Sequence, residues 1–327
     1  MKECDVAVQS FNKPESLIYT LLSLKKYCGK HIDKIYINDD CSKCDMSKYY
    51  LNPKFINLMK PIKIVYRRNT KPSGYSYTLV TREMWKKKSI IKKLQLIGFF
   101  IIKRAKIYKT SNDVRYQWAI NNTDKKYLML IHDDIKFYDD ILNIYLEGIN
   151  DSYSIVGDLG GSKLCEFGPC GTKNCCPEKI VNGIYPCKNW PITGKRKNIL
   201  LRILGRKNYN CRINEWCCLL NVNVTKKIFE RKGIYFGNYE DGGDVGTYWL
   251  SEAIKMGYKF TDPIPRFEER KRYYLHWWQG YEGHSVWIKK QKYERKLIID
   301  SLLRDFSFDF NEIFDGDKKN DYGEKKG

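Results

Sequence analysis

Four short apolar runs, each ending abruptly in polar residues, dominate the first half of the chain. The clearest is residues 127–131, which read Tyr-Leu-Met-Leu-Ile and stop at His132-Asp133-Asp134. Such runs are typical of strands that are buried on both faces of a parallel sheet. The other three runs are residues 5–11, 34–38 and 62–66.

An amphipathic segment separates the first two runs. It predicts a helix over residues 15–28, with Leu17, Thr20, Leu21 and Leu24 on its apolar face. Strand, helix and strand in this order are typical of the opening of a doubly wound α/β sheet. Further patterns predict helices at 138–150, 223–232 and 248–256, and strands at 154–157 and 258–261. Between them, the glycines of residues 158–161 predict a turn.

Polar residues follow three of these four runs at their carboxyl ends. They are Asp39-Asp40-Cys41-Ser42, Arg67-Arg68-Asn69 and His132-Asp133-Asp134. Ligands collect at this edge of an open α/β sheet, and carboxylates there suit a divalent cation that binds phosphate. The alternative is that these acids only cap turns and helices.

Composition narrows the class of protein. The chain has 327 residues, 43% of them hydrophobic, and a net charge of +21, which indicates anionic partners. We expect a cytoplasmic protein without a signal peptide, because Met1 leads almost directly into a strand. The longest apolar run, residues 94–102, is far shorter than the roughly 20 residues that a membrane span needs. The twelve cysteines are then expected to be thiols or metal ligands.

The order of these motifs resembles that of GT-A nucleotide-sugar glycosyltransferases of the family 2 type. The resemblance rests on residues 8–14, 37–42, Arg68-Asn69 with Gly74, and His132-Asp133-Asp134. It implies a GT-A-like, Rossmann-type mixed sheet that is flanked by helices. His132 departs from the family pattern, which has Asp-x-Asp at this place.

The resemblance also implies roles for single residues on the donor side. Asp39 and Asp40 would hold the base and ribose of the donor, and Arg67, Arg68 and Arg115 are candidates to neutralise its diphosphate. Arg115 is expected on a helix over residues 112–119. Turn or cap positions for the acids and solvated surface positions for the arginines are the alternatives.

The metal and the catalytic base follow from the same resemblance. Asp134 would bind Mn²⁺ or Mg²⁺ with help from His132 or Asp133. Apart from the resemblance, the aromatic segment 273–284 contains His276 and His284, either of which could complete the metal shell. Asp241 or Asp244, ahead of a helix that ends in Gly-Tyr, would be the catalytic base. The alternatives are structural histidines and acids that favour a helix N-terminus.

Two segments exceed the family pattern within an expected catalytic domain of residues 1–300. The basic insertion 75–111 contains nine Lys or Arg residues and no acid between Trp85 and Lys109. It predicts a helical pair that either contacts an anionic membrane surface or packs with one basic solvated face. The Cys-rich insertion 163–218 is a candidate for structural Zn²⁺, although Cys217 and Cys218 also fit a buried strand. Residues 301–327 are expected to be a C-terminal extension, partly disordered.

The function that these features favour is metal-dependent, inverting transfer of a hexose from a UDP- or GDP-sugar to a glycan or lipid-linked acceptor. Two alternatives remain open at this point. One is a zinc-containing nucleic-acid-binding protein, against which the basic residues are spread along the chain without a binding module. The other is a nucleotidyltransferase, which has a similar sheet and also uses a metal ion but releases pyrophosphate from a nucleoside triphosphate.

Overall fold

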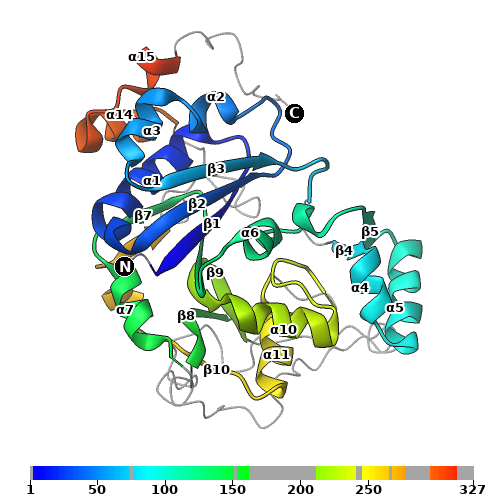
Figure 1. Ribbon diagram of the computed structural model, residues 1–327. Coiled ribbons are helices and arrows are strands. Elements are labelled where there is room, and N and C mark those ends of the chain that lie inside the picture. Colours follow the sequence, from blue (N-terminus) through cyan, green and yellow to red (C-terminus); the bar gives the residue numbers. More distant parts are fainter. Residues whose placement is uncertain are drawn as a thin grey trace.

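The structure is a computed structural model that describes residues 3–73, 77–150, 153–161, 211–240, 245–264, 267–276 and 295–314. Its centre is a mixed seven-stranded sheet with helices on both faces (Figure 1), which confirms the predicted fold class. The strand order is β10-β8-β9-β6-β1-β2-β3. The bounds are β1 Cys4–Ser10, β2 Ile32–Asp39, β3 Lys63–Arg68, β6 Tyr127–Ile131, β8 Tyr153–Gly161, β9 Cys211–Asn221 and β10 Lys259–Thr261.

The four strands predicted in the first half of the chain pair in parallel with one another, and β8 and β10 form a further parallel pair. β1 pairs in parallel with β2 on one side and with β6 on the other, and β2 pairs with β3. The register sets Ser10 opposite Asp39, and Asp39 opposite Arg68. The polar ends of these strands therefore lie at one edge. The chain adds β2 and β3 on one side of β1 and then β6 on its other side. The strand order therefore reverses between β1 and β6, and open α/β sheets bind ligands at such a topological switch point.

Strand β9 makes the sheet mixed, because it runs antiparallel to both β6 and β8. Successive side chains of a strand point to opposite faces. Cys217 accordingly joins the core cluster on one face and Cys218 the cluster on the other, and both are fully buried. Burial raises the pKa of each thiol. These two cysteines are core residues and not partners in one zinc site.

Residues 158–161 are not the glycine-rich turn that the sequence predicts. They continue β8, and Gly160 and Gly161 pair with Arg212 and Cys211 of β9. The register shifts between Gly157 and Leu159, and Gly157 has a φ of 150°. Gly157 therefore serves a close approach between the two antiparallel strands, because a Cβ at this position would lie only 2.7 Å from Cβ of Cys218.

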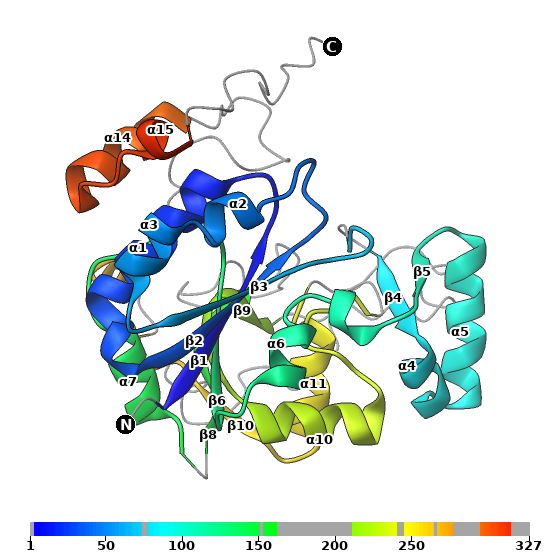
Figure 2. The ribbon, with the colours of Figure 1, turned by 45° about the horizontal axis from the view of Figure 1, so that its top comes forward.

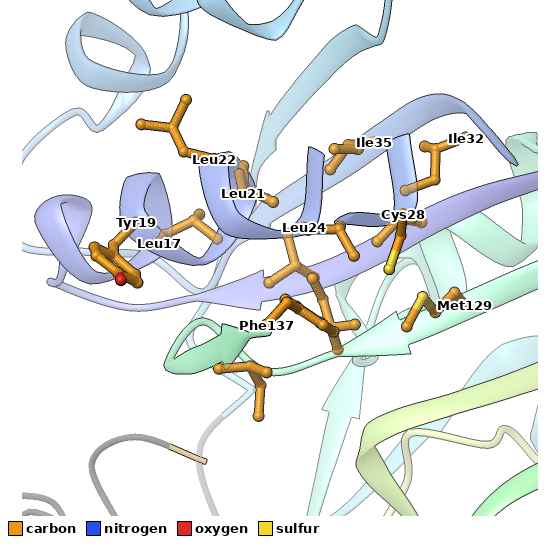
Figure 3. Packing of buried hydrophobic residues seen from close by; sticks show 14 of the residues in the cluster. Leu17, Tyr19, Leu21, Leu22, Leu24, Cys28, Ile32, Ile35, Met129 and Phe137 are labelled. Atoms are coloured by element: carbon orange, nitrogen blue, oxygen red, sulfur yellow. The ribbon is translucent and has the colours of Figure 1, made fainter. Parts of the chain in front are cut away.

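Helix α1 (Pro14–Cys28) covers one face of the parallel strands, as its apolar pattern predicts. Leu17, Leu21 and Leu24 are completely buried against the sheet (Figure 3). Helices α3 (Pro53–Met59) and α7 (Ile141–Gly148) contribute to the same cluster. The opposite face is covered by α6 (Gln117–Asn122), α10 (Val222–Lys232) and α11 (Thr247–Lys255).

The C-terminal helices belong to the same core. The boundary expected at residue 300 falls inside α14 (Arg295–Phe306), which packs on α1 and is followed by α15 (Phe310–Phe314). Ile298, Leu302 and Phe308 are buried in the cluster around α1. Residues 301–314 therefore contribute side chains to the same cluster as α1. Residues 315–327 lie outside the described residues.

The basic insertion folds into a lobe at the side of the sheet (Figures 1 and 2). The predicted helical pair is present as α4 (Arg82–Lys87) and α5 (Ile90–Ile101). The sequence did not predict that two short strands, β4 (Thr78–Thr81) and β5 (Ala105–Tyr108), enclose this pair and run parallel to each other. No helix of the described residues is long and apolar enough to cross a membrane.

Candidate metal centre

Three side chains with metal-ligating atoms meet just beyond the carboxyl end of β6. His132 and Asp134 follow β6 directly, and His276 ends β11 (Tyr274–His276), which pairs with β7 (Ile135–Phe137). The Nε2 atom of His276 lies 2.7 Å from Oδ1 of Asp134 and 3.2 Å from Nδ1 of His132. His132 Nδ1 lies 3.8 Å from the same carboxylate oxygen. The structure thus brings together the three residues that the sequence proposed as metal ligands.

These separations fit a shared cation. Ligand atoms about 2.0–2.2 Å from a metal ion lie roughly 3.0–3.5 Å from each other in tetrahedral or octahedral geometry. The three observed distances bracket this range. Two imidazoles and one carboxylate are a donor set for a borderline transition ion, and they suit Mg²⁺ poorly because Mg²⁺ prefers oxygen ligands.

The site is buried enough for its charges to interact strongly. Only 3% of the Asp134 side chain and 10% of the His276 side chain are exposed. Burial alone would raise the pKa of Asp134, but the charge and hydrogen bond of His276, with Lys13 and His132, hold this pKa below its ordinary value. The carboxylate is therefore ionised at neutral pH, as a metal ligand must be.

Glu215 of β9 lies beside Nε2 of His132, the ring nitrogen that does not face the other two ligands. The sequence did not predict this partner. Its Oε1 lies 3.6 Å from Nε2 of His132, and its Oε2 lies 3.1 Å from a guanidinium nitrogen of Arg212. Burial would raise the pKa of Glu215, but Arg212 and His132 lower this pKa to about 2. An ionised carboxylate at Nε2 favours the tautomer that leaves the lone pair on Nδ1, which faces His276 and Asp134.

Trp216, next to Glu215, holds the second histidine. Its ring stacks on His276 with centroids 4.6 Å apart and an angle of 10° between the planes. This contact restricts the rotation of the His276 ring. The sequence placed only the neighbouring Cys217 and Cys218 in a candidate buried strand. Glu215 and Trp216 come next to His132 through the pairing of β9 with β6, which the sequence alone does not reveal.

We expect Glu215→Gln to weaken Mn²⁺ binding about tenfold or more, because an uncharged amide no longer fixes the His132 tautomer. Titration of the protein with Mn²⁺ by calorimetry measures the effect. Glu252→Gln is a matched control, since Glu252 of α11 is also a buried acid but pairs with Lys232 of α10 and Lys255 of α11. Equal Mn²⁺ affinity in Glu215→Gln and Glu252→Gln would contradict an orienting role for Glu215.

Asp133 connects this centre to the loop between β1 and α1. Its Oδ2 accepts a hydrogen bond from the Phe11 backbone at 3.4 Å, and its carbonyl accepts one from the Ser16 hydroxyl at 2.7 Å. Burial raises the pKa of Asp133. These contacts join the residues after β6 to the segment after β1, beside the topological switch point. Direct ligation by Asp133 stays a prediction.

Asp39 ends β2 and is fully buried. Its Oδ1 accepts the backbone N–H of Ser42 at 2.9 Å, and its Oδ2 accepts the Tyr66 hydroxyl at 3.0 Å. Burial raises the pKa of Asp39, against the lowering effect of these donors. A position in a turn, the alternative considered for Asp39, accounts for these contacts. Binding of the donor base stays a prediction.

Asp40 is held by the loop that follows β3. It accepts hydrogen bonds from the Ser73 backbone at 2.6 Å, from the Ser73 hydroxyl at 2.7 Å and from the Asn69 amide at 3.0 Å. Its carboxylate is therefore directed at this loop and not at the His132 cluster. It shares the edge of the sheet with that cluster, and its ribose contact stays a prediction.

The three arginines differ in their surroundings. Arg67 pairs with the buried Asp113 and donates to Asn38, so it holds the sheet to the segment before α6. Arg68 is 40% exposed and lies 3.7 Å from Asp39. Arg115 precedes α6, not inside the predicted helix, and its guanidinium lies 5.6 Å from the centre of the Tyr239 ring. Diphosphate binding by Arg68 and Arg115 stays a prediction.

Several predicted residues lie outside the described residues. These are the candidate bases, the second candidate histidine and most of the Cys-rich insertion, namely Asp241, Asp244, His284, Cys165, Cys170, Cys175, Cys176 and Cys187. The structural Zn²⁺ expected for that insertion is therefore a prediction only. Asp241 and Asp244 lie between Glu240 and Val245, both of which are buried.

No family model and no curated protein matches this sequence. Solved structures do match the fold. A mannosyltransferase from Pyrobaculum calidifontis in complex with GDP-Man and Mn²⁺ is 11% identical, with a TM-score of 0.40 over 80% of this chain and 54% of its own. Core-mannan synthase A from Aspergillus fumigatus is 11% identical, with a TM-score of 0.41 over 84% and 75%. The 4-diphosphocytidyl-2C-methyl-D-erythritol synthase from Anaerococcus prevotii is 10% identical, with a TM-score of 0.40 over 80% and 88%. The chain thus spans about half the length of the first of these structures.

Proposed function

We propose that this protein is a metal-dependent glycosyltransferase that uses a nucleotide-sugar donor. The observation that carries the proposal is the convergence of His132, Asp134 and His276 at the carboxyl end of β6. This centre adjoins the switch point of the sheet, where a nucleotide is expected to bind. The motif order described above supports the same class.

Four residues at the carboxyl end of the sheet would hold the cation or fix its ligands. His132, Asp134 and His276 hold the cation, and Glu215 keeps His132 in the ligating tautomer. When bound, Mn²⁺ neutralises the diphosphate and so stabilises the nucleoside diphosphate as it leaves. Arg68 adds positive charge at the same edge of the sheet. Mn²⁺ is preferred to Mg²⁺ because two of the three ligand atoms are imidazole nitrogens.

Activation of the acceptor is assigned to the acidic segment that follows Glu240. Asp241 or Asp244 would take the proton from the acceptor hydroxyl as it attacks the anomeric carbon. The bond from the anomeric carbon to the diphosphate oxygen breaks as the new glycosidic bond forms. A single displacement of this kind inverts the anomeric configuration. A glycan or a lipid-linked sugar is the proposed acceptor.

The proposal is tested by thermal-shift titration with UDP- and GDP-sugars, each with and without Mn²⁺. We expect a nucleotide sugar to raise the melting temperature only when Mn²⁺ is present, because His132, Asp134 and His276 would hold the cation that neutralises the donor diphosphate. Product analysis then separates the enzyme classes. Release of a nucleoside diphosphate supports the proposal, whereas release of pyrophosphate from a nucleoside triphosphate would show a nucleotidyltransferase.

A further inference from the structure

The outer side of α5 exposes a stripe of large apolar side chains. Ile90, Leu94 and Ile101 are 77%, 64% and 76% exposed, and Ile97 is 44% exposed. These positions are spaced by four, three and four residues, so they lie along one side of the helix. Scattered single apolar residues on a surface need no explanation, but a continuous stripe on one helix does.

Packing among the described residues does not account for this stripe. Leu96 and Phe99, on the other side of α5, are buried with Val80 and Ala105 of the two lobe strands. The helix is therefore attached to its lobe by a separate apolar face. Figures 1 and 2 both show α5 at the outer border of that lobe, on the side away from the seven-stranded sheet.

Positive charge surrounds the stripe. Lys86 precedes α5 and Lys103 and Arg104 follow it, and all three are exposed. The segment from Trp85 to Lys109 holds nine Lys or Arg residues and no acid. An apolar stripe between cationic ends is the arrangement by which amphipathic helices lie on anionic bilayers.

We propose that the outer side of α5 docks on an anionic membrane surface. The stripe of Ile90, Leu94, Ile97 and Ile101 enters the boundary between headgroups and acyl chains, while the flanking cations contact lipid phosphates. Charge complementarity selects this occupant over a second copy of the chain, whose own cations around the same stripe would repel it. The inference goes beyond the proposed function, and its test requires no turnover.

The test is co-sedimentation of the full chain with vesicles of phosphatidylcholine, with and without phosphatidylglycerol. We expect binding to the anionic vesicles only, and weaker binding as salt screens the charges. The double variant Leu94→Glu/Ile101→Glu should bind at least about tenfold more weakly, because two carboxylates oppose insertion and repel the lipid phosphates. Both side chains are exposed, so the melting temperature should stay close to that of the wild-type protein.

Leu303→Glu is the matched control, since Leu303 is a 52% exposed leucine on α14 that lies outside the lobe. It should leave vesicle binding unchanged. Equal binding by the double variant and the wild-type protein would overturn the proposal, because general positive charge would then explain binding. Absence of binding to anionic vesicles would overturn it too, as would a dimer in solution that the double variant abolishes.

Discussion

Asp134→Asn is expected to weaken Mn²⁺ binding at least about a hundredfold and to abolish metal-dependent transfer. Asp134 provides the only negative charge among the three ligands, and its Oδ1 lies close to a ring nitrogen of each histidine. Asparagine has the same shape but is uncharged, so the two imidazoles lose the anion that makes the site attract a cation. Calorimetric titration with Mn²⁺ measures this loss directly, without any assumption about the donor.

The protein offers a matched control for this change. Asp140 also pairs with a histidine, since its Oδ2 lies 3.3 Å from Nε2 of His31, and it caps α7 by accepting the Asn143 backbone N–H. Asparagine is an equally good N-cap residue. Asp140→Asn should therefore keep wild-type Mn²⁺ affinity. Near-normal Mn²⁺ affinity in Asp134→Asn would remove the basis of the metal assignment.

The parallel strands and the first two ligands could be predicted because they depend on short stretches of sequence. Strands buried on both faces give continuous apolar runs, and polar residues at their ends mark the ligand-binding edge. His132 and Asp134 follow such a strand directly. His276 was one of two candidate histidines, and only the pairing of β11 with β7 brings it next to Asp134.

The features that were missed depend on contacts between distant parts of the chain. Glu215 gains its role only because β9 inserts antiparallel between β6 and β8. Residues 158–161 read as a turn because glycines dominate them, whereas pairing with β9 keeps them extended. In the same way, no local pattern predicts that Asp158 forms an ion pair with Arg270.

Arg270→Met is expected to lower the free energy of unfolding by about 3–5 kcal/mol, since it removes one partner of a buried charge cluster. The Arg270 guanidinium lies 2.7 Å from Asp158 and 2.9 Å from Asp262, and it donates to the Ile264 carbonyl at 2.8 Å. Burial alone would lower the pKa of Arg270, but these two carboxylates raise it. Methionine fills a similar volume and leaves both carboxylates buried without a cation.

Denaturant unfolding at neutral pH measures the size of this effect. A free energy of unfolding in Arg270→Met that equals the wild-type value would contradict a stabilising role for the buried charge cluster.

Arg270 also lies six residues before His276, on the segment that brings this ligand to Asp134. Arg304→Met is the matched control, because Arg304 forms its ion pair with Asp305 at the surface, with 65% of its side chain exposed. Exposed pairs of this kind contribute little to stability. A protein that is both destabilised and weaker in Mn²⁺ binding after Arg270→Met, but not after Arg304→Met, would show that the buried charge cluster holds the metal centre together.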